Sequence, residues 1–477
     1  MSVYFERPGI AVHCGDVRAV CRALPANFVQ TVVTSPPYWG LRDYGVPPSI
    51  WGGDPDCKHR FKPTRLAKGG GSTSSFRRDR KAGLKRGTVQ PGFCRCGAWK
   101  GCYGLEPTPE LFVEHTVEIF REVRRVLRDD GTLWLNLGDS YANDAKGYRG
   151  GRGSSTLTGD GNYQHEASPP ELQKGWRQSL NGLKRKDLIG IPWMVAFALR
   201  ADGWNLRSDV VWSKRNTTPQ SVRDRPTSAH EHIFLLSKKP KYFYDVVGSS
   251  EVATGEAPGN RKHKAAEAYE AGDRLLRRAA GFTAMSGYAQ RQMRSVWSMS
   301  SAPYKGAHFA AFPPELVRRC LSAGVNEFGC CAACGSPWRR IVERVRMPTR
   351  TGKASKVNAI VLDPNSPYAE HRGKIAGNRD PKRHVTLKIT KGWERTCKCE
   401  AAAIEPCRVF DPFHGAGTTM CVAQRLGLEY VGAEIKPDYV DQSIVRLETP
   451  IVFPHERVKT KRRRRVREQR ELFTIEA

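Results

Sequence analysis

Thr31-Val32-Val33-Thr34-Ser35-Pro36-Pro37-Tyr38 is the stretch from which the fold can be predicted. Its β-branched residues 31–33 predict a short buried strand of a parallel sheet. Two consecutive prolines cannot continue a sheet ladder, so the strand ends just before Pro36. In an open α/β sheet, the ligand crevice lies just past the carboxyl ends of the strands. We therefore expect Ser35, the Pro36 carbonyl and the Tyr38 ring to face a bound ligand.

A second stretch, residues 409–434, predicts a companion site. Val409-Phe410-Asp411 indicates a strand end, and the turn His414-Gly415-Ala416-Gly417 leads into a helix. Glycine permits positive φ and close backbone approach, and the free N–H groups of a helix start favour an anion. The next strand ends at Glu434, an acid suited to a ribose diol. Strand, turn, helix, strand and acid in this order indicate a nucleoside-like ligand.

Together the two stretches resemble the DNA methyltransferases that modify exocyclic amino groups, over roughly residues 10–240 and 300–447. The resemblance implies that Ser35-Pro36-Pro37-Tyr38 is the catalytic tetrapeptide and that S-adenosylmethionine is the cofactor. For Asp16, the alternative to a cofactor contact is the N-cap of a helix. For the segment with His308 and Phe309, the alternative to a cofactor contact is a strand–turn–helix packing unit. The residues that the resemblance assigns to the cofactor are Asp16, His308, Phe309, Asp411, Phe413, Gly415, Gly417, Thr418 and Glu434.

The order of the two stretches is that of the family's beta-type members, which are circularly permuted. The resemblance thus implies an α/β fold with one doubly wound, Rossmann-like methyltransferase sheet, in which the C-terminal strand–helix–strand lies beside the N-terminal strands. A target-recognition role is expected for residues 246–300, with a plain surface insertion as the alternative. The expected parts are a catalytic half at 1–245 with an insertion at 52–104, the segment 246–300, a cofactor-binding half at 301–447 with an insertion at 326–405, and a basic tail at 448–477.

Cysteine spacing predicts that both insertions bear zinc. The chain has 14 cysteines, several of them in close pairs with metal-ligand spacing, which does not resemble a secreted disulfide framework. Four soft ligands around a polar insertion suit tetrahedral structural zinc. Unrelated buried thiols are the alternative for the first set, in which Cys102 could replace a ligand. The two sets are Cys57, His59, Cys94 and Cys96, and Cys331, Cys334, Cys397 and Cys399.

Charge points to a polyanionic partner. The formal net charge is +30, from 78 Lys and Arg against 48 Asp and Glu. With the resemblance, this implies double-stranded DNA; a soluble basic protein with a charged tail is the alternative. No signal peptide and no long apolar run occur, so we expect no membrane partner and a cytoplasmic location, in a prokaryotic cell or a phage-infected host. The sequence does not reveal the oligomeric state.

The residue before Pro36 bears on the target base. Family members with Ser there mostly methylate N4 of cytosine, so cytosine is favoured, with N6 of adenine as the alternative. Ring-carbon methylation needs a cysteine in the catalytic loop, and none lies between Val32 and Gly53. An RNA or protein amide methyltransferase usually carries Asn where Ser35 stands. A non-catalytic zinc-bearing DNA-binding protein would explain the charge and the cysteines, but not the two paired stretches.

Overall fold

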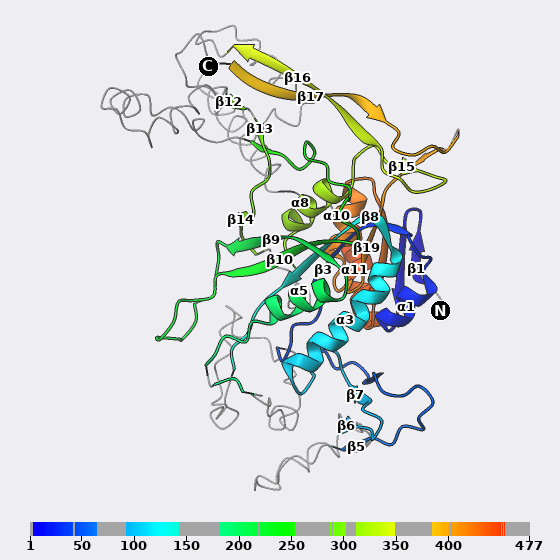
Figure 1. Cartoon of the computed structure of the whole chain (residues 1–477), viewed down its shortest axis with the longest axis vertical. Helices are drawn as coiled ribbons and strands as arrows, with labels where there is room; N and C mark the ends of the chain where they lie inside the picture. The colour runs from blue at the N-terminus through cyan, green and yellow to red at the C-terminus, as the bar shows by residue number, and fades with distance from the viewer. Residues whose placement is uncertain are drawn as a thin grey trace, which may run out of the picture.

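One large mixed sheet organises the molecule (Figure 1). The computed structural model describes residues 3–41, 43–63, 92–142, 182–184, 186–217, 219–252, 287–288, 290–301, 312–348, 384–400, 403–449, 451 and 453. Within them, nine strands form this sheet in the order β1-β2-β20-β19-β3-β8-β10-β9-β14. Their bounds are β1 Val3–Arg7, β2 Ile10–Cys14, β3 Val29–Thr34, β8 Leu127–Leu137, β9 Asn205–Lys214, β10 His230–Ser237, β14 Val296–Met299, β19 Arg408–Asp411 and β20 Glu429–Glu434.

The C-terminal strands lie between N-terminal strands, as predicted. β19 pairs with β3 in parallel, with Phe410 opposite Val32, and β20 pairs in parallel with β2. β2, β20, β19, β3 and β8 therefore run in one direction, whereas β10 is antiparallel to both β8 and β9. Circular permutation, which is a statement about relatives, stays a prediction.

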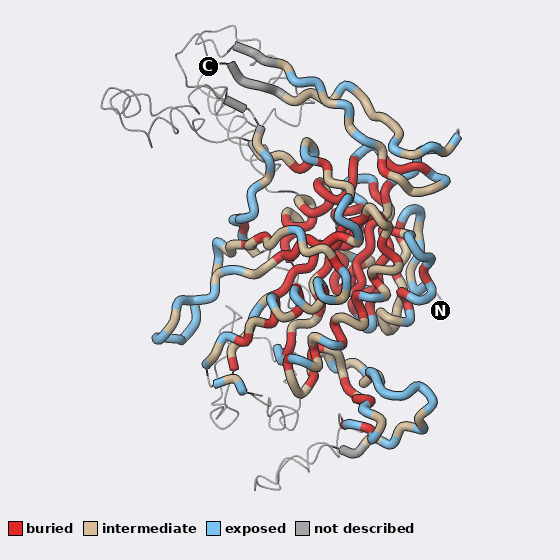
Figure 2. The backbone as a smooth tube through the Cα atoms, viewed as in Figure 1, coloured by how far each residue is buried: buried red, intermediate tan, exposed pale blue. Residues whose placement is uncertain are grey.

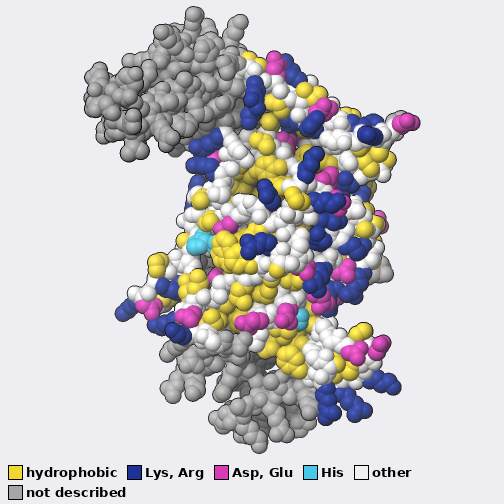
Figure 3. Space-filling model, in the orientation of Figure 1, with side chains coloured by type: hydrophobic (Ala, Val, Ile, Leu, Met, Phe, Trp, Pro, Cys, Tyr) yellow, Lys and Arg dark blue, Asp and Glu magenta, His cyan; other side chains and the backbone are white. Residues whose placement is uncertain are grey.

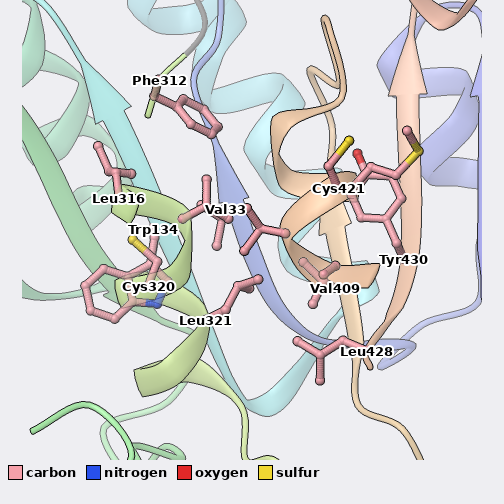
Figure 4. Close-up of a cluster of buried hydrophobic side chains, with 14 of the residues drawn as sticks. Val33, Trp134, Phe312, Leu316, Cys320, Leu321, Val409, Cys421, Leu428 and Tyr430 are labelled. Atoms are coloured by element: carbon pink, nitrogen blue, oxygen red, sulfur yellow. The ribbon is translucent and has the colours of Figure 1, made fainter. Parts of the chain in front are cut away.

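Helices cover both faces of the sheet, which confirms a three-layer α/β architecture. Side chains alternate along each strand, so Val32 and Leu133 face one layer, whereas Val33 and Trp134 face the other. Figure 4 shows α8 (Pro314–Gly324) packed on Val33 and Trp134, and Figure 2 shows burial concentrated at the centre of the sheet. The first layer consists of α1 (Val17–Ala23), α3 (Pro109–Val126) and α5 (Ile191–Ala201), and the second of α8 (Pro314–Gly324), α10 (Thr418–Arg425) and α11 (Pro437–Leu447).

Two small modules extend from opposite ends of the sheet (Figure 1). The first is a four-stranded sheet of β4 (Ser49–Trp51), β7 (Trp99–Gly101), β6 (Gly92–Phe93) and β5 (Lys62–Pro63). The second contains the pair β15 (Cys330–Cys331) and β18 (Ile404–Glu405), and the long pair β16 (Arg339–Pro348) and β17 (His384–Glu394), which β12 (Gly287–Tyr288) extends. They lie in the predicted insertions 52–104 and 326–405, apart from β4 and β12.

Two other predicted segments are only partly visible. Of segment 246–300, the described residues include the short pair β11 (Glu251–Val252) and β13 (Gln290–Arg291), and β14, which belongs to the central sheet. Most of that segment and most of the basic tail lie outside the described residues, so their roles stay predictions. Each described helix is too short or too polar to cross a membrane.

Candidate active site

Strand ends from both halves of the chain meet at one edge of the sheet. Five parallel strands end there, and β10 begins there because it runs antiparallel to β8, with His232 opposite Leu137. The edge therefore collects Ser35 after β3, Phe413 after β19 and Glu434 at the end of β20. This is the edge at which open α/β sheets bind ligands.

The tetrapeptide Ser35-Pro36-Pro37-Tyr38 is fixed by hydrogen bonds to the Tyr38 hydroxyl. Ser35 Oγ donates to Tyr38 Oη over 3.2 Å, and Tyr38 Oη donates to Glu231 Oε2 over 2.7 Å. Burial raises the pKa of Tyr38 well above its usual value, so the phenol stays neutral and donates. Gly138 leaves room for the ring, because a Cβ there would lie 2.7 Å from a Tyr38 ring carbon.

Glu231 and Asn136 are site residues that the sequence reasoning missed. Asn136 Nδ2 donates to Tyr38 Oη over 2.7 Å and to Glu231 Oε2 over 2.8 Å, and Lys214 forms an ion pair with Glu231. The Oδ1 atom of Asn136 is buried and has no hydrogen-bond partner among the described residues. An unpaired buried acceptor next to Tyr38 suits a ligand that brings its own donor. For Asn136, the sequence offered one signal: it is the lone polar residue within the apolar stretch 133–137.

Asp411 joins the tetrapeptide's strand to the glycine turn, residues 414–417. Its carboxylate accepts hydrogen bonds from Thr34 Oγ1 and Thr419 Oγ1, both over 2.7 Å, and from the Phe413 N–H over 3.1 Å. Burial raises the pKa of this carboxyl to about 6. Asp411 is 1% exposed, so it holds these segments together from the protein interior. A direct contact with the cofactor stays a prediction.

The glycine turn wraps around Glu434. Gly415 and Gly417 both have positive φ, 53° and 71°, and Gly417 is the N-cap of α10. Glu434 Oε2 accepts from the Gly415 N–H over 2.8 Å, and its Oε1 accepts from the N–H groups of residues 435 and 436 over 3.0 Å. A carboxylate offers about four acceptor positions, so one remains for a ligand hydroxyl. Thr418 opens α10, with its hydroxyl accepting from Arg446 over 2.8 Å.

Asp16 and Phe413 are the remaining predicted cofactor residues that the structure describes. Asp16 is the N-cap of α1, accepting from the Arg18 N–H over 2.8 Å, as in the alternative interpretation. It follows β2, whose end lies beside Glu434, so contact with the cofactor's adenine stays a prediction. Phe413 stacks on Tyr103, with 5.7 Å between ring centroids. His308 and Phe309 lie outside the described residues.

Both predicted metal sets come together. In each set, one potential ligand atom per residue lies within 4.8 Å of the others. In the first, Cys57 Sγ is 3.8 Å from Cys94 Sγ, close to the edge of about 3.8 Å of a tetrahedron with zinc–sulfur bonds of about 2.3 Å. Cys102 lies outside the set, because its Sγ donates to the Val46 carbonyl over 3.2 Å. The donors fit zinc, whose presence stays a prediction.

Comparisons with known proteins identify the family. A model of the DNA methylase family matches residues 29–364 and 402–445. Type II methyltransferase M.Cfr9I of Citrobacter freundii is 30% identical over 443 residues, which cover 93% of this chain and 89% of the relative. Type II methyltransferase M.XycI of Xanthomonas campestris pv. cyanopsidis is 36% identical over 312 residues, covering 65% and 71%.

Among solved structures, PvuII DNA methyltransferase (cytosine-N4-specific) aligns with a TM-score of 0.42 and 12% identity, covering 94% of this chain and 90% of that chain. The family assignment comes from the sequence matches alone. Because the family match spans most of the chain and M.Cfr9I is similar over nearly its whole length, the chain belongs to the family of DNA methylases that modify N4 or N6 amino groups.

Proposed function

We propose that this DNA methyltransferase transfers the methyl group of S-adenosylmethionine to N4 of a cytosine in double-stranded DNA. One observation carries the proposal: the tetrapeptide and the glycine turn lie at the ends of the paired strands β3 and β19. Thr34, just before Ser35, and Thr419, just after the turn, share the Asp411 carboxylate. A methyl donor at the turn and an acceptor base at Ser35 would thus be held side by side.

Ser35 and the Pro36 carbonyl would activate the target nitrogen. An amino group on a base is a poor nucleophile, because its lone pair is delocalised into the ring. Ser35 Oγ already donates its proton to Tyr38, so its lone pairs are free to accept from the base amino group. The Pro36 carbonyl would accept the second amino hydrogen. Both contacts draw electron density toward the nitrogen.

The base must leave the duplex to reach Ser35. Flipping costs roughly a few kcal/mol, and stacking on Tyr38 would recover about 1–3 kcal/mol. S-adenosylmethionine, when bound, supplies an electrophilic methyl group. The base nitrogen would form its bond to the methyl carbon as the sulfur–carbon bond breaks, leaving S-adenosylhomocysteine, and the methylated nitrogen would then lose one proton to solvent.

The cofactor would lie along the edge from β2 to β19. Gly415, Gly417 and Thr418 would surround its methionine end, with Asp411 and Phe413 behind them. Glu434 has one acceptor position left for a ribose hydroxyl. Asp16 would contact the adenine, and His308 and Phe309 would line the methionine end.

Exposed basic residues support phosphate binding at the same edge. The loop between β9 and β10, residues 215–229, begins and ends there and carries the exposed Arg215 and Arg223. Lys and Arg side chains are also spread across the face seen in Figure 3. Such contacts position DNA without reading its sequence, and they make binding depend on salt. Both cysteine sets would hold structural zinc.

Three measurements test the proposal. DNA modified by the purified protein is digested to nucleosides, and mass spectrometry should find N4-methylcytosine. N6-methyladenine as the only product would reject cytosine while leaving the site intact.

Ser35→Ala should lower turnover by about a hundredfold or more, the scale of lost transition-state hydrogen bonds. Calorimetry should find its affinity for S-adenosylmethionine near normal, as it should for the control Ser322→Ala on α8. Equal turnover of Ser35→Ala and wild type would refute the role of the hydroxyl.

A further inference from the structure

The tetrapeptide rests on a second segment, residues 104–106. The Trp39 indole donates to the Glu106 carbonyl over 2.9 Å, and the Gly40 N–H donates to the Gly104 carbonyl over 2.8 Å. Gly104 has a φ of +91°, and a Cβ there would lie 3.0 Å from the Pro37 Cβ. This segment is therefore the surface against which the Pro37-Tyr38 turn is placed.

A buried acid holds that segment. Glu106 is 0% exposed; its Oε2 accepts from the Gly104 N–H over 2.9 Å, and its Oε1 lies 2.9 Å from His115 Nδ1. Burying a carboxylate costs several kcal/mol, and apolar residues of similar volume often pack as well or better. Burial also raises the pKa of Glu106. The contacts of this carboxylate therefore hold the backbone of residues 104–106 in one position.

His115 is fixed from its other side. Its ring stacks on Trp51, with 4.6 Å between centroids, and on Trp99, with 5.3 Å. The two tryptophans are register partners on β4 and β7, and both are buried. The imidazole thus has little freedom, and it presents Nδ1 to Glu106 in one orientation. Contacts run without a gap from the first module to Pro37.

We propose that Glu106, held by His115, is a positioning residue for methyl transfer. Its carboxylate keeps the Gly104 backbone against Pro37 and thereby sets where the Tyr38 ring meets the flipped base. The inference rests on the proposed function, because it assigns Glu106 a role in that reaction through Tyr38. Glu106 itself contacts neither base nor cofactor.

The test compares two replacements of similar size. Glu106→Gln keeps an acceptor for the Gly104 N–H, whereas Glu106→Met does not. Misplacement by about 1 Å can cost about a hundredfold, so Glu106→Met should lower the single-turnover rate by roughly ten- to a hundredfold. The dissociation constant for S-adenosylmethionine should change by less than about twofold, since no residue assigned to the cofactor is replaced. Glu106→Gln should restore most of the rate, and the exposed Glu110→Met is the control.

A double-mutant cycle separates positioning from folding. In a Tyr38→Ala background, Glu106→Met should cause little further loss of rate, because both changes act on one step. A purely structural role would instead lower the melting temperature and the active fraction, and leave the rate per active site unchanged. An unchanged rate, or full additivity with Tyr38→Ala, would overturn the inference.

Gly104→Ala keeps the test decisive if Glu106→Met does not fold. The added methyl presses on Pro37 without removing a buried charge, and the positive φ of Gly104 adds backbone strain of about 1–2 kcal/mol. It should give a loss of rate in the same range with a near-normal affinity for S-adenosylmethionine, and a normal rate would overturn the inference. Failure of the proposed function looks different, since the wild-type protein would then yield no N4-methylcytosine in DNA.

Discussion

Asp411 connects the tetrapeptide to the glycine turn through its two carboxylate oxygens, one for each side. Its partners Thr34 and Thr419 lie at the end of β3 and the start of α10, and both hydroxyls donate to its carboxylate. The methyl donor and the acceptor base would then be aligned by side chains that touch neither. A buried carboxylate with neutral partners is costly when ionised, which explains the raised pKa.

Asp411→Asn should change how stability depends on pH. The pKa of the Asp411 carboxyl is about 6 in the folded protein against 3.8 for an ordinary aspartate. The folded state therefore holds the proton more tightly. The stability from this group is complete below about pH 3.8 and is lost as pH rises through about 6. The loss amounts to about 3 kcal/mol at most, and Asn at this position, which has no proton to lose, should not show it.

The measurement is the urea midpoint of wild type and Asp411→Asn from pH 4 to 7, without cofactor. The difference between the two proteins should shift in favour of the variant as pH rises. The control is Asp438→Asn, which removes the same charge at an exposed position. A difference that stays constant with pH would show that Asp411 ionises normally.

At this scale the sequence was informative only where residue types are tied to a motif. The tetrapeptide, the glycines and Glu434 could be proposed in advance as site residues, because the family resemblance and the predicted strand ends both point to them. Glu231 could not, because its contact with Tyr38 spans 193 positions in the chain and depends on the register of β10 against β8. The same holds for Thr34 and Asp411, which are 377 positions apart.

Elements were more predictable than contacts, because their signals are local. Thr108 caps α3 through its side chain, with Pro109 in the first turn, as the dipeptide predicts. The strand expected at residues 31–33 is β3, and the strand-forming, mostly apolar stretches at 132–137 and 230–236 lie in β8 and β10. β8 starts at Leu127 and continues through Asp130-Gly131, since sheet pairing with Val29 outweighs the turn propensity of that dipeptide.

Gly417→Ala should destabilise the packing of α10 on α11. A Cβ at Gly417 would lie 2.7 Å from the Ser443 Cβ and 3.0 Å from the Met420 Cε. Overpacking of this kind costs about 1–3 kcal/mol, in addition to about 1–2 kcal/mol for a side chain at positive φ. Gly427→Ala is the matched control, because Gly427 has a φ of +70° and nothing within 4 Å of its Cβ position.

Urea denaturation of both variants gives the packing cost as the difference in their free energies of unfolding. Equal losses in the two would mean that α11 yields to the methyl group. The clash of a Gly417 side chain with Ser443 also affects how a loss of cofactor binding is interpreted. Loss of S-adenosylmethionine binding in Gly417→Val would not by itself locate the ligand, so Gly415→Val is the more direct test of its placement.

At the scale of the whole molecule, the two cysteine sets lie at opposite ends of the sheet. The first belongs to the module that packs on His115, beyond the carboxyl end of β3. The second lies at the amino end, where Gln30 of β3 donates to the Gly335 carbonyl over 3.1 Å and Arg128 of β8 donates to the Cys334 carbonyl. Spacing predicted each set, but not its end of the sheet, which depends on how the insertions pack.

Opposite placement predicts different consequences of losing each metal. The intact protein should contain about two zinc ions per chain, and Cys57→Ser and Cys331→Ser should each lose about one, since each breaks one four-ligand set. Because zinc binding is coupled to folding, each loss should unfold its own module. Cys57→Ser should therefore lower the rate of methyl transfer, through Trp51, Trp99 and His115. Cys331→Ser should lower the melting temperature by several degrees, about 2–4 °C for each kcal/mol lost, with a near-normal rate per folded molecule.

Elemental analysis, thermal denaturation and single-turnover rates are measured on the same preparations, with Cys14→Ser as the control because Cys14 belongs to neither set. A protein that is fully active without zinc would refute the metal sites, and equal losses of rate in Cys57→Ser and Cys331→Ser would refute the division of roles between the two ends.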